Sequence, residues 1–459
     1  MKPYSLCDSC LEKQRRIDQL LEENGRLKAL LHYRDKKQNE GFFGSSTPSA
    51  QRPVKPNTDS EKPSKRGGRP QGHPGHGRKS FDPEEAARVV QVDLDAACPD
   101  CGLPMQDKGV RYRSVLEIPP PHPEPILYRL RKYYCSRCKK AHQAQAPAVL
   151  PKALFGNQLI ARIAFLHYVQ GIPLGRICDP MGLDLGSVVQ MLHRLAGLFK
   201  PVVPHLIQLY RRAPVRHADE TSWRTDGRSG YAWLFSTPDM SLFLFRPTRS
   251  ASVPREVFGN RLLSGVLVVD RYNGYNQVPC RLQYCYAHLM REVEDLAKEF
   301  PDHAEVSVFT ATLIPLLAEA MHLRGQLIAD PDYYRRAAAL KKAIIAVSHQ
   351  SAQHLGIRRI QDIFRDHAKR LYHWVKDRAV PPDNNRAERE LRPTVIARKV
   401  SFGSQSEAGA QTRGILMSLL HTLKKRQKDA ENSFKSVLDR LASNTQQDSI
   451  SFLSPADSS

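Results

Sequence analysis

The chain has 459 residues, with 69 Lys plus Arg against 47 Asp plus Glu and a formal net charge of +22 at pH 7. This length allows two or three domains with a sizeable core, and the positive charge predicts DNA as a partner, held through its phosphates. The sequence has no run of about 18 uncharged apolar residues and no apolar leader, which predicts a soluble, cytoplasmic protein without a membrane partner. The nine cysteines then indicate metal sites or free thiols rather than disulfides.

Residues 1–40 carry a heptad pattern of apolar residues flanked by charges. The pattern predicts a short coiled coil over residues 11–34, through which the chain would form a homo-oligomer; an amphipathic helix packed on its own protein is the alternative. The residues in the a and d positions are Ile17, Leu20, Asn24, Leu27 and Leu31. The pair Cys7 and Cys10 cannot complete a tetrahedral metal site unless two chains contribute ligands.

Residues 41–80 lose this periodicity and become rich in Pro, Gly, Ser and basic residues, which predicts a linker. The stretch Lys65–Pro70 is similar to an Arg-Gly-Arg-Pro hook, whose arginines enter the narrow minor groove of A·T-rich DNA. A plain solvated linker is the alternative. The DNA contacts expected here are Lys65, Arg66, Arg69, Arg78 and Lys79.

Residues 81–150 contain two Cys-x-x-Cys knuckles, separated by a gap that a long hairpin could fill. Their four cysteines are Cys98, Cys101, Cys135 and Cys138. Four converging thiolates would form a closed tetrahedral site, so we expect a zinc ribbon with one structural zinc. The alternatives are two unrelated knuckles, or a relict ribbon that only packs.

Residues 151–212 have a helical pattern. Pro173–Pro180 and Leu185–Leu195 predict two helices around a tight turn at Gly182, an arrangement compatible with helix-turn-helix. The second helix has few charges, so a role in the core is an equally good interpretation.

An α/β core is expected over residues 213–430, and two acids in it follow strand-like runs. The apolar run Val266–Val269 predicts a buried strand, from which Asp270 emerges, and a second run predicts a strand that ends near Asp219. Sites often form at the C-terminal ends of parallel strands. Alternation along the strand places Asp219 and Glu220 on opposite faces and favours Asp219.

The other strands of this core are also indicated by apolar runs. We expect strands at Tyr231–Ser236, Leu242–Arg246 and Leu282–Tyr286, and a short helix at Val253–Phe258. His288 is expected to open the next helix and to be an active-site or phosphate contact. Cys285 is interpreted as a small buried hydrophobe rather than a metal ligand.

A third acid, Glu388, follows a long helical interval that predicts an insertion over about residues 302–378. Capping residues predict that the next helix begins at Asn384 or Asn385, with Asn385, Glu388 and Arg392 along one face. Pro393 is expected to limit this helix. Further phosphate contacts are expected at Arg392, Arg398, Lys399 and residues 423–428, before a C-terminal tail at 431–459.

Three acids far apart in sequence could hold two divalent cations, which clamp the attacking and leaving oxygens of a phosphodiester displacement. Oxygen ligands suit a hard cation, so magnesium, or manganese, is expected. The alternative is that these acids are solvated residues at strand ends.

The segments His217–Arg224, Asp270–Asn276 and Asn384–Pro393 together resemble the insertion sequence 66 family of bacterial DDE transposases. The likeness spans almost the whole chain, and the block at Asn384 is its most specific part. Arg271 stands where many members have glycine, and Ser222 where many have proline. Neither change replaces an acid.

The resemblance implies an RNase H-like catalytic core whose acids are Asp219, Asp270 and Glu388. The expected architecture is a multidomain α/β protein in which this core, with its α-helical insertion, follows the coiled coil, basic linker, zinc ribbon and helical region. The implied activity is metal-dependent cleavage at transposon ends and transfer of the 3′-hydroxyl to target DNA, with or without accessory proteins of the same element. The alternatives are a regulatory DNA-binding protein with idle acids, or a nuclease without strand transfer.

Overall fold

A computed structural model describes residues 8–39, 84, 123–130, 132–135, 140–143, 146–147, 149–151 and 153–443. The chain divides into two compact units, of which one spans residues 53–123; the other unit is described below. The expected linker and most of the expected zinc ribbon lie outside the described residues. So do Cys7, Cys98, Cys101, Cys138, Lys65, Arg66, Arg69, Arg78, Lys79 and the side chains of Cys10 and Cys135.

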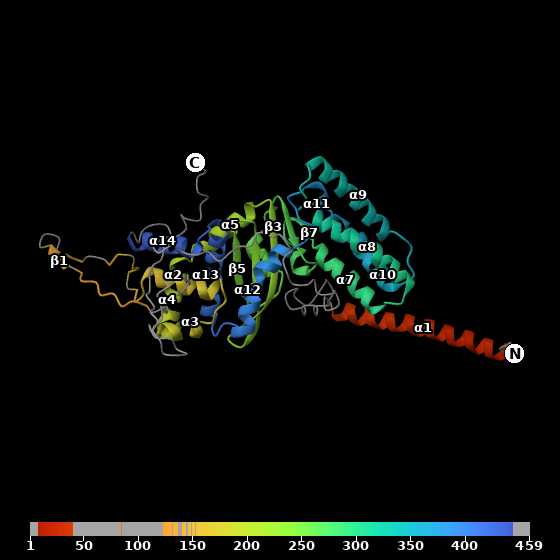
Figure 1. The fold of residues 1–459 in the computed structure, drawn as a ribbon, viewed down its shortest axis with the longest axis horizontal. Coiled ribbons are helices and arrows are strands. Elements are labelled where there is room, and N and C mark those ends of the chain that lie inside the picture. The colour runs from red at the N-terminus through yellow and green to blue at the C-terminus, as the bar shows by residue number, and fades with distance from the viewer. Residues whose placement is uncertain are drawn as a thin grey trace, which may run out of the picture. The chain divides into compact units, whose positions relative to one another are not determined.

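The secondary structure is mostly helical, with one two-stranded and one five-stranded sheet in the described part (Figure 1). The helices are α1 (Asp8–Asn39), α2 (Asn157–Tyr168), α3 (Leu174–Met181), α4 (Leu185–Leu198), α5 (Val202–Arg212), α6 (Ser252–Phe258), α7 (Tyr286–Glu299), α8 (Ala304–Leu323), α9 (Asp330–Ser348), α10 (Leu355–Asp366), α11 (His373–Lys376), α12 (Asn385–Ser401), α13 (Glu407–Arg426) and α14 (Ala430–Ser443). The strands are β1 (Lys132–Cys135), β2 (Lys140–Gln143), β3 (Val215–Thr225), β4 (Arg228–Ser236), β5 (Ser241–Arg246), β6 (Val266–Val269) and β7 (Arg281–Tyr284), and short 3-10 turns lie at η3 (Asn273–Tyr275) and η4 (Ala368–Arg370).

The five-stranded sheet has the order β5-β4-β3-β6-β7. Strands β5, β4 and β3 are antiparallel neighbours, whereas β6 and β7 run parallel to β3. Asp226 and Gly227, both with positive φ, make the tight turn between β3 and β4, as expected for a two-residue hairpin loop. All of Val266–Val269 is buried, because parallel strands are covered on both faces.

Strand β3 corrects one expectation. It continues to Thr225, so Asp219 lies within the strand rather than at its end. The reason is that pairing with β4 extends from His217 to Thr225, whereas pairing with β6 stops at His217. A hairpin partner therefore sustains a polar stretch that the sequence pattern does not mark as strand.

Helix α12 also differs from expectation at its end. It begins at Asn385, as expected, but Pro393 does not limit it and the helix continues to Ser401. Both ends of α12 are attached to β3, which offsets the hydrogen bond that proline cannot donate. Beyond Ser401 the chain turns back, and Ser404 exchanges backbone hydrogen bonds with Arg224 and Asp226, each at 2.9 Å.

Helices α2–α5 gather with α13 and α14 at the β5 side of the sheet (Figure 1). The pair α3 and α4 forms around Gly182, whose φ of 62° completes the turn, and α4 buries Val188, Leu192 and Leu195 in the core. Helix α13 covers the open edge of β5. There the Phe243 N–H donates to Ser418 Oγ at 2.8 Å, which satisfies a group that would otherwise be exposed at an edge strand.

Helices α8–α11 form the insertion, which follows β7 and α7 and precedes α12. The segment 285–286 at the start of α7 contacts the segment 382–384 that leads into α12, and we call this contact the neck. There Tyr286 N–H donates to Pro382 O at 2.8 Å, and Asn384 N–H donates to Cys285 Sγ at 3.1 Å. In the described part, α8 is the single helix long and apolar enough to cross a membrane by length and composition, but it packs against α7 and α9. Leu327, which follows α8, is fully exposed.

Helix α1 covers the region of the expected coiled coil. The side chains of its apolar seam are about half exposed in the single chain. They are Ile17, Leu20, Leu27 and Leu31. Pairing of two such helices stays a prediction.

Candidate active site

Asp219 lies on β3, and Asp270 directly follows β6, which runs parallel to β3. The pairing of β3 with β6 ends at His217 and Val268, two residues before each acid. Neighbouring strands lie about 4.8 Å apart, so the backbone positions of the two acids are close together. Their side chains are buried, with 2% and 5% of their surface exposed.

Helix α12 covers the face of β3 that carries Asp219. His217 and Thr221, which flank Asp219 on that face by alternation, both bond to α12: His217 Nδ1 lies 2.9 Å from Asn384 Oδ1, and Arg398 donates to Thr221 Oγ1 at 2.9 Å. Asp219 therefore points to the same side as α12.

Glu220 has the opposite orientation and is neutralised within the protein. Its Oε1 accepts hydrogen bonds from Arg249 at 2.9 and 2.6 Å, and its Oε2 accepts one from Tyr275 at 2.5 Å. Burial and the neighbouring charge of Asp270 nevertheless raise the pKa of the Glu220 carboxyl to about 7.

Asn384 joins three elements at the start of α12. Its side-chain amide donates to Ala218 O at 2.8 Å, and its backbone N–H donates to Cys285 Sγ at the start of α7. Its Oδ1 faces His217, and burial lowers the pKa of His217 to about 3, so the imidazole is neutral and donates from Nδ1. Asn384 thus fixes the first turn of α12 beside Asp219.

Glu388 lies one turn into α12 and faces α7. Its Oε2 accepts a hydrogen bond from Arg291 at 3.1 Å, and its Oε1 lies 3.7 Å from His288 Nδ1. The ligand atoms of Cys285, His288 and Glu388 all lie within 4.8 Å of one another, a set that could hold a metal. Burial raises the pKa of the Cys285 thiol to about 12, however, which disfavours the thiolate that a soft metal needs.

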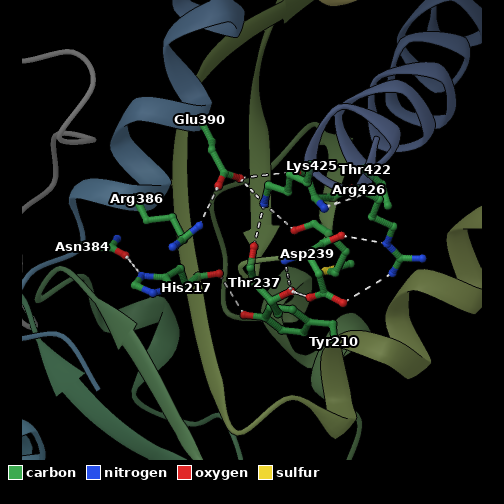
Figure 2. A network of polar contacts seen from close by, with 12 residues as sticks. Tyr210, His217, Thr237, Asp239, Asn384, Arg386, Glu390, Thr422, Lys425 and Arg426 are labelled. Atoms are coloured by element: carbon green, nitrogen blue, oxygen red, sulfur yellow. Dashed lines mark hydrogen bonds and ion pairs between the residues drawn. The ribbon is translucent and has the colours of Figure 1, made fainter. Parts of the chain in front are cut away.

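Glu390 points toward Lys425 of α13 (Figure 2). It pairs with Lys425 Nζ of α13 at 2.8 Å and accepts a hydrogen bond from Ser241 Oγ at 3.0 Å. Lys425 also donates to the carbonyls of Thr237 and Met240, both at 2.7 Å. Lys425 was expected in a phosphate-binding surface, but it is instead mostly buried and fastens the β4–β5 turn to α12.

The other expected DNA contacts on α12 have mixed environments. Arg398 is half-buried and donates to Thr221 and Ser222 of β3, so the structure uses its guanidinium within the protein. Arg392 and Lys399 are exposed. Asn385 and Arg386 line one cavity. The partners of Glu388 are instead Arg291 and His288.

Sequence reasoning missed the anchoring role of Asn384 and the pairing of Arg291 with Glu388. The N-cap position of Asn384 marks a helix start but does not say which strand the side chain binds. Arg291 follows His288 by three residues, and this spacing on one helix face could have marked it. Arg271, which departs from the family pattern, pairs with Glu292 of α7. His288 lies inside α7, which starts two residues earlier than expected.

The family model described as "Transposase IS66 family" matches residues 152–412, which is more than half of the chain. The chain belongs to this family. A second model, the zinc-finger binding domain of transposase IS66, matches residues 95–139. This transposase therefore has a zinc-finger domain ahead of its transposase domain, and DNA is its partner.

Curated relatives of this IS66-family chain come from Sinorhizobium fredii (strain NBRC 101917 / NGR234). The uncharacterized protein y4qI is 26% identical over 81% of this chain and 75% of its own length. The uncharacterized protein y4jD is 24% identical over 77% of this chain and 76% of its own length. The similarity therefore covers most of both chains.

Proposed function

We propose that this IS66-family protein is a DDE transposase that cuts DNA at the ends of its element and joins the freed 3′-hydroxyl to target DNA. Its core is of RNase H-like type, with Asp219, Asp270 and Glu388 as the catalytic acids. One observation supports the proposal: the parallel pairing of β3 with β6 ends two residues before Asp219 and Asp270, and Asn384 ties the helix of Glu388 to Ala218, the residue before Asp219.

Three carboxylates are the residue types that suit a hard divalent cation, although in the described part the set of ligand atoms within 4.8 Å of one another is that of Cys285, His288 and Glu388. Asp219 and Asp270 are both buried, and the pKa of the neighbouring Glu220 is raised by burial and then by the charge of Asp270. Glu388 Oε1 is buried and accepts no hydrogen bond in the described part. Carboxylate oxygens suit magnesium or manganese, so we assign two such ions to Asp219, Asp270 and Glu388.

Such ions would supply activation of water and neutralisation of the leaving oxygen. The chain's own residues set the geometry: Asn384 orients α12, and Arg249 with Tyr275 keeps Glu220 out of the site. Arg291 and His288 hold the Glu388 carboxylate at the surface of α7. Because Arg291 carries a charge beside this carboxylate, it is also placed to contact a phosphate once Glu388 engages a cation.

The remaining parts of the protein serve DNA binding and assembly in this proposal. Cys98, Cys101, Cys135 and Cys138 hold one zinc in the zinc-finger domain, and metal analysis that finds none would contradict this. Helix α1 pairs with a second copy as a coiled coil. The protein acts on terminal inverted repeats and target DNA in the cytoplasm.

Cleavage of end DNA by acid variants tests the proposal. Purified protein is incubated with flanking DNA that contains the terminal inverted repeats, plus magnesium, and nicks and joined products are measured. Asp219→Asn and Asp270→Asn should abolish both products while DNA binding persists, because the positive surface is unchanged. Nicks without joined products would indicate a nuclease, and substantial cleavage by either variant would contradict the assignment.

A further inference from the structure

A cavity of about 580 Å³ lies between the insertion and the start of α12. His217 forms part of its wall, so the cavity reaches the strand of Asp219 from the side of α12. Its charged lining residues are Arg324, Arg378, Arg386, Arg389 and Asp383. We call this cavity the arginine pocket.

The four arginines are not equivalent. Arg378 is used to hold the loop after α8, since it donates to the carbonyls of Ile328 and Gln326 and pairs with Asp330 at 2.9 Å. Arg389 is exposed and makes no hydrogen bond or ion pair with any described residue. An arginine that lines a cavity without an internal partner is available to a ligand.

Arg324 and Arg386 are also largely available. Arg324 Nε donates to Arg378 O at 3.0 Å, which fixes the side chain and leaves the outer nitrogens of its guanidinium to face a ligand. Arg386 has one weak ion pair, 3.9 Å from Glu390. The single acid of the lining, Asp383, already accepts the backbone N–H of Asn385 at 3.0 Å.

The charges of the arginine pocket come from two parts of the fold. Arg324 belongs to the insertion and Arg386 to α12, so their charges converge on one place from two parts of the fold. Such a concentration of guanidinium groups with one acid favours an anion with several acceptor oxygens.

We propose that the arginine pocket binds a backbone phosphate of duplex DNA beside the catalytic acids. The choice of DNA rests on the proposed function, because the pocket opens next to the strand that carries Asp219. Planar guanidinium groups bind phosphate oxygens in pairs, and a phosphate held by Arg324 and Arg389 together bridges the insertion and α12. The insertion then acts as one side of the DNA clamp.

Binding to duplex DNA of arbitrary sequence, without divalent cations, tests the pocket independently of cleavage. Arg324→Ala/Arg389→Ala should weaken binding about tenfold. The slope of log affinity against log salt concentration should fall by about 0.9, the value for one lost phosphate contact. Arg389→Glu alone should act in the same direction, and its exposed position without partners leaves folding unchanged, as thermal unfolding verifies.

Arg335→Glu is the matched control. Arg335 lies on α9 in the same insertion, with 76% of its side chain exposed, and this variant changes the net charge by the same two units away from the pocket. It should change neither affinity nor salt slope. Unchanged DNA binding by both Arg389→Glu and the double variant would overturn the proposal, and would leave an acidic protein partner as the occupant of the pocket. A loss in Arg335→Glu equal to that of the pocket variants would overturn the proposal in favour of a net-charge effect. Wild-type protein that binds DNA with this arginine dependence but never cleaves it would support the pocket and contradict the proposed function.

Discussion

Two glutamates on α12 show how one helix serves two purposes. Glu388 and Glu390 are two residues apart, which is about 200° around a helix axis. Glu388 faces α7, where its Oε1 lies buried without a hydrogen bond to any described residue, whereas Glu390 has a lysine and a hydroxyl as partners. Glu388 therefore keeps one oxygen without a hydrogen bond to a described residue, which makes it the better candidate for a ligand, whereas Glu390 is fastened within the protein.

The Glu390 side is an internal network (Figure 2). Lys425 is mostly buried between α12, α13 and the β4–β5 turn, and burial lowers its pKa to about 8 although Glu390 opposes this shift. Arg426 extends the network to Asp239, whose carbonyl accepts a hydrogen bond from it at 3.0 Å. Substitutions in this network should therefore lower the free energy of unfolding more than substitutions of Glu388.

The largest effect is expected for Glu388→Gln. It should reduce cleavage about a thousandfold, because the variant loses the charge that would hold a cation, a contribution of several kcal/mol. The free energy of unfolding should change little, since Arg291 is partly exposed and can be hydrated. Cleavage rates and urea unfolding measure both quantities. If Glu388→Gln were strongly destabilised but kept its cleavage activity per folded molecule, Glu388 would be the structural acid and the comparison with Glu390 would be reversed.

A smaller effect of the opposite kind is expected for Glu390→Gln. Removing one partner of a largely buried ion pair should lower the free energy of unfolding by about 3 kcal/mol. Cleavage per folded molecule should remain within about threefold of wild type, because the change is on the far side of α12. Loss of cleavage in fully folded Glu390→Gln would show that the helix register of α12 is misassigned.

The smallest effect concerns the pH dependence of stability. The pKa of folded Lys425, about 8, lies below its ordinary value of 10.5, so the unfolded chain keeps the proton to higher pH. Stability from this group should therefore rise as pH increases through that interval, by about 1 kcal/mol between about pH 7.5 and about pH 9. Lys425→Met should remove this rise, as urea unfolding at both pH values would show. An equal rise in wild type and variant would assign it to other groups.

The sequence predicted most of the parts that local pattern controls. The strand Val266–Val269 agrees with its apolar run, and α12 starts where capping residues place it. Long-range pairing was beyond the pattern: β3 extends past Asp219 because β4 pairs with it, and α12 passes Pro393 because both its ends are attached to β3.

The site was predicted unevenly for the same reason. Motif and alternation selected Asp219 over Glu220, and the structure gives Glu220 internal partners. Charge alone could not separate roles among basic residues. Lys425 and Arg398 look like surface cations in sequence, yet both bond to groups inside the protein, and only the three-dimensional contacts distinguish them from Arg389.

The neck has a consequence for how the size of this protein can vary. Because Tyr286 bonds to Pro382 and Cys285 to Asn384, helices α7–α11 form a closed excursion whose two ends are already joined. The entropy of closing such a loop changes by only about 0.6 kcal/mol for each doubling of its length. The loops between α8 and α11 can therefore be shortened or extended at little cost, whereas α7, whose Arg291 and His288 contact Glu388, has to be kept.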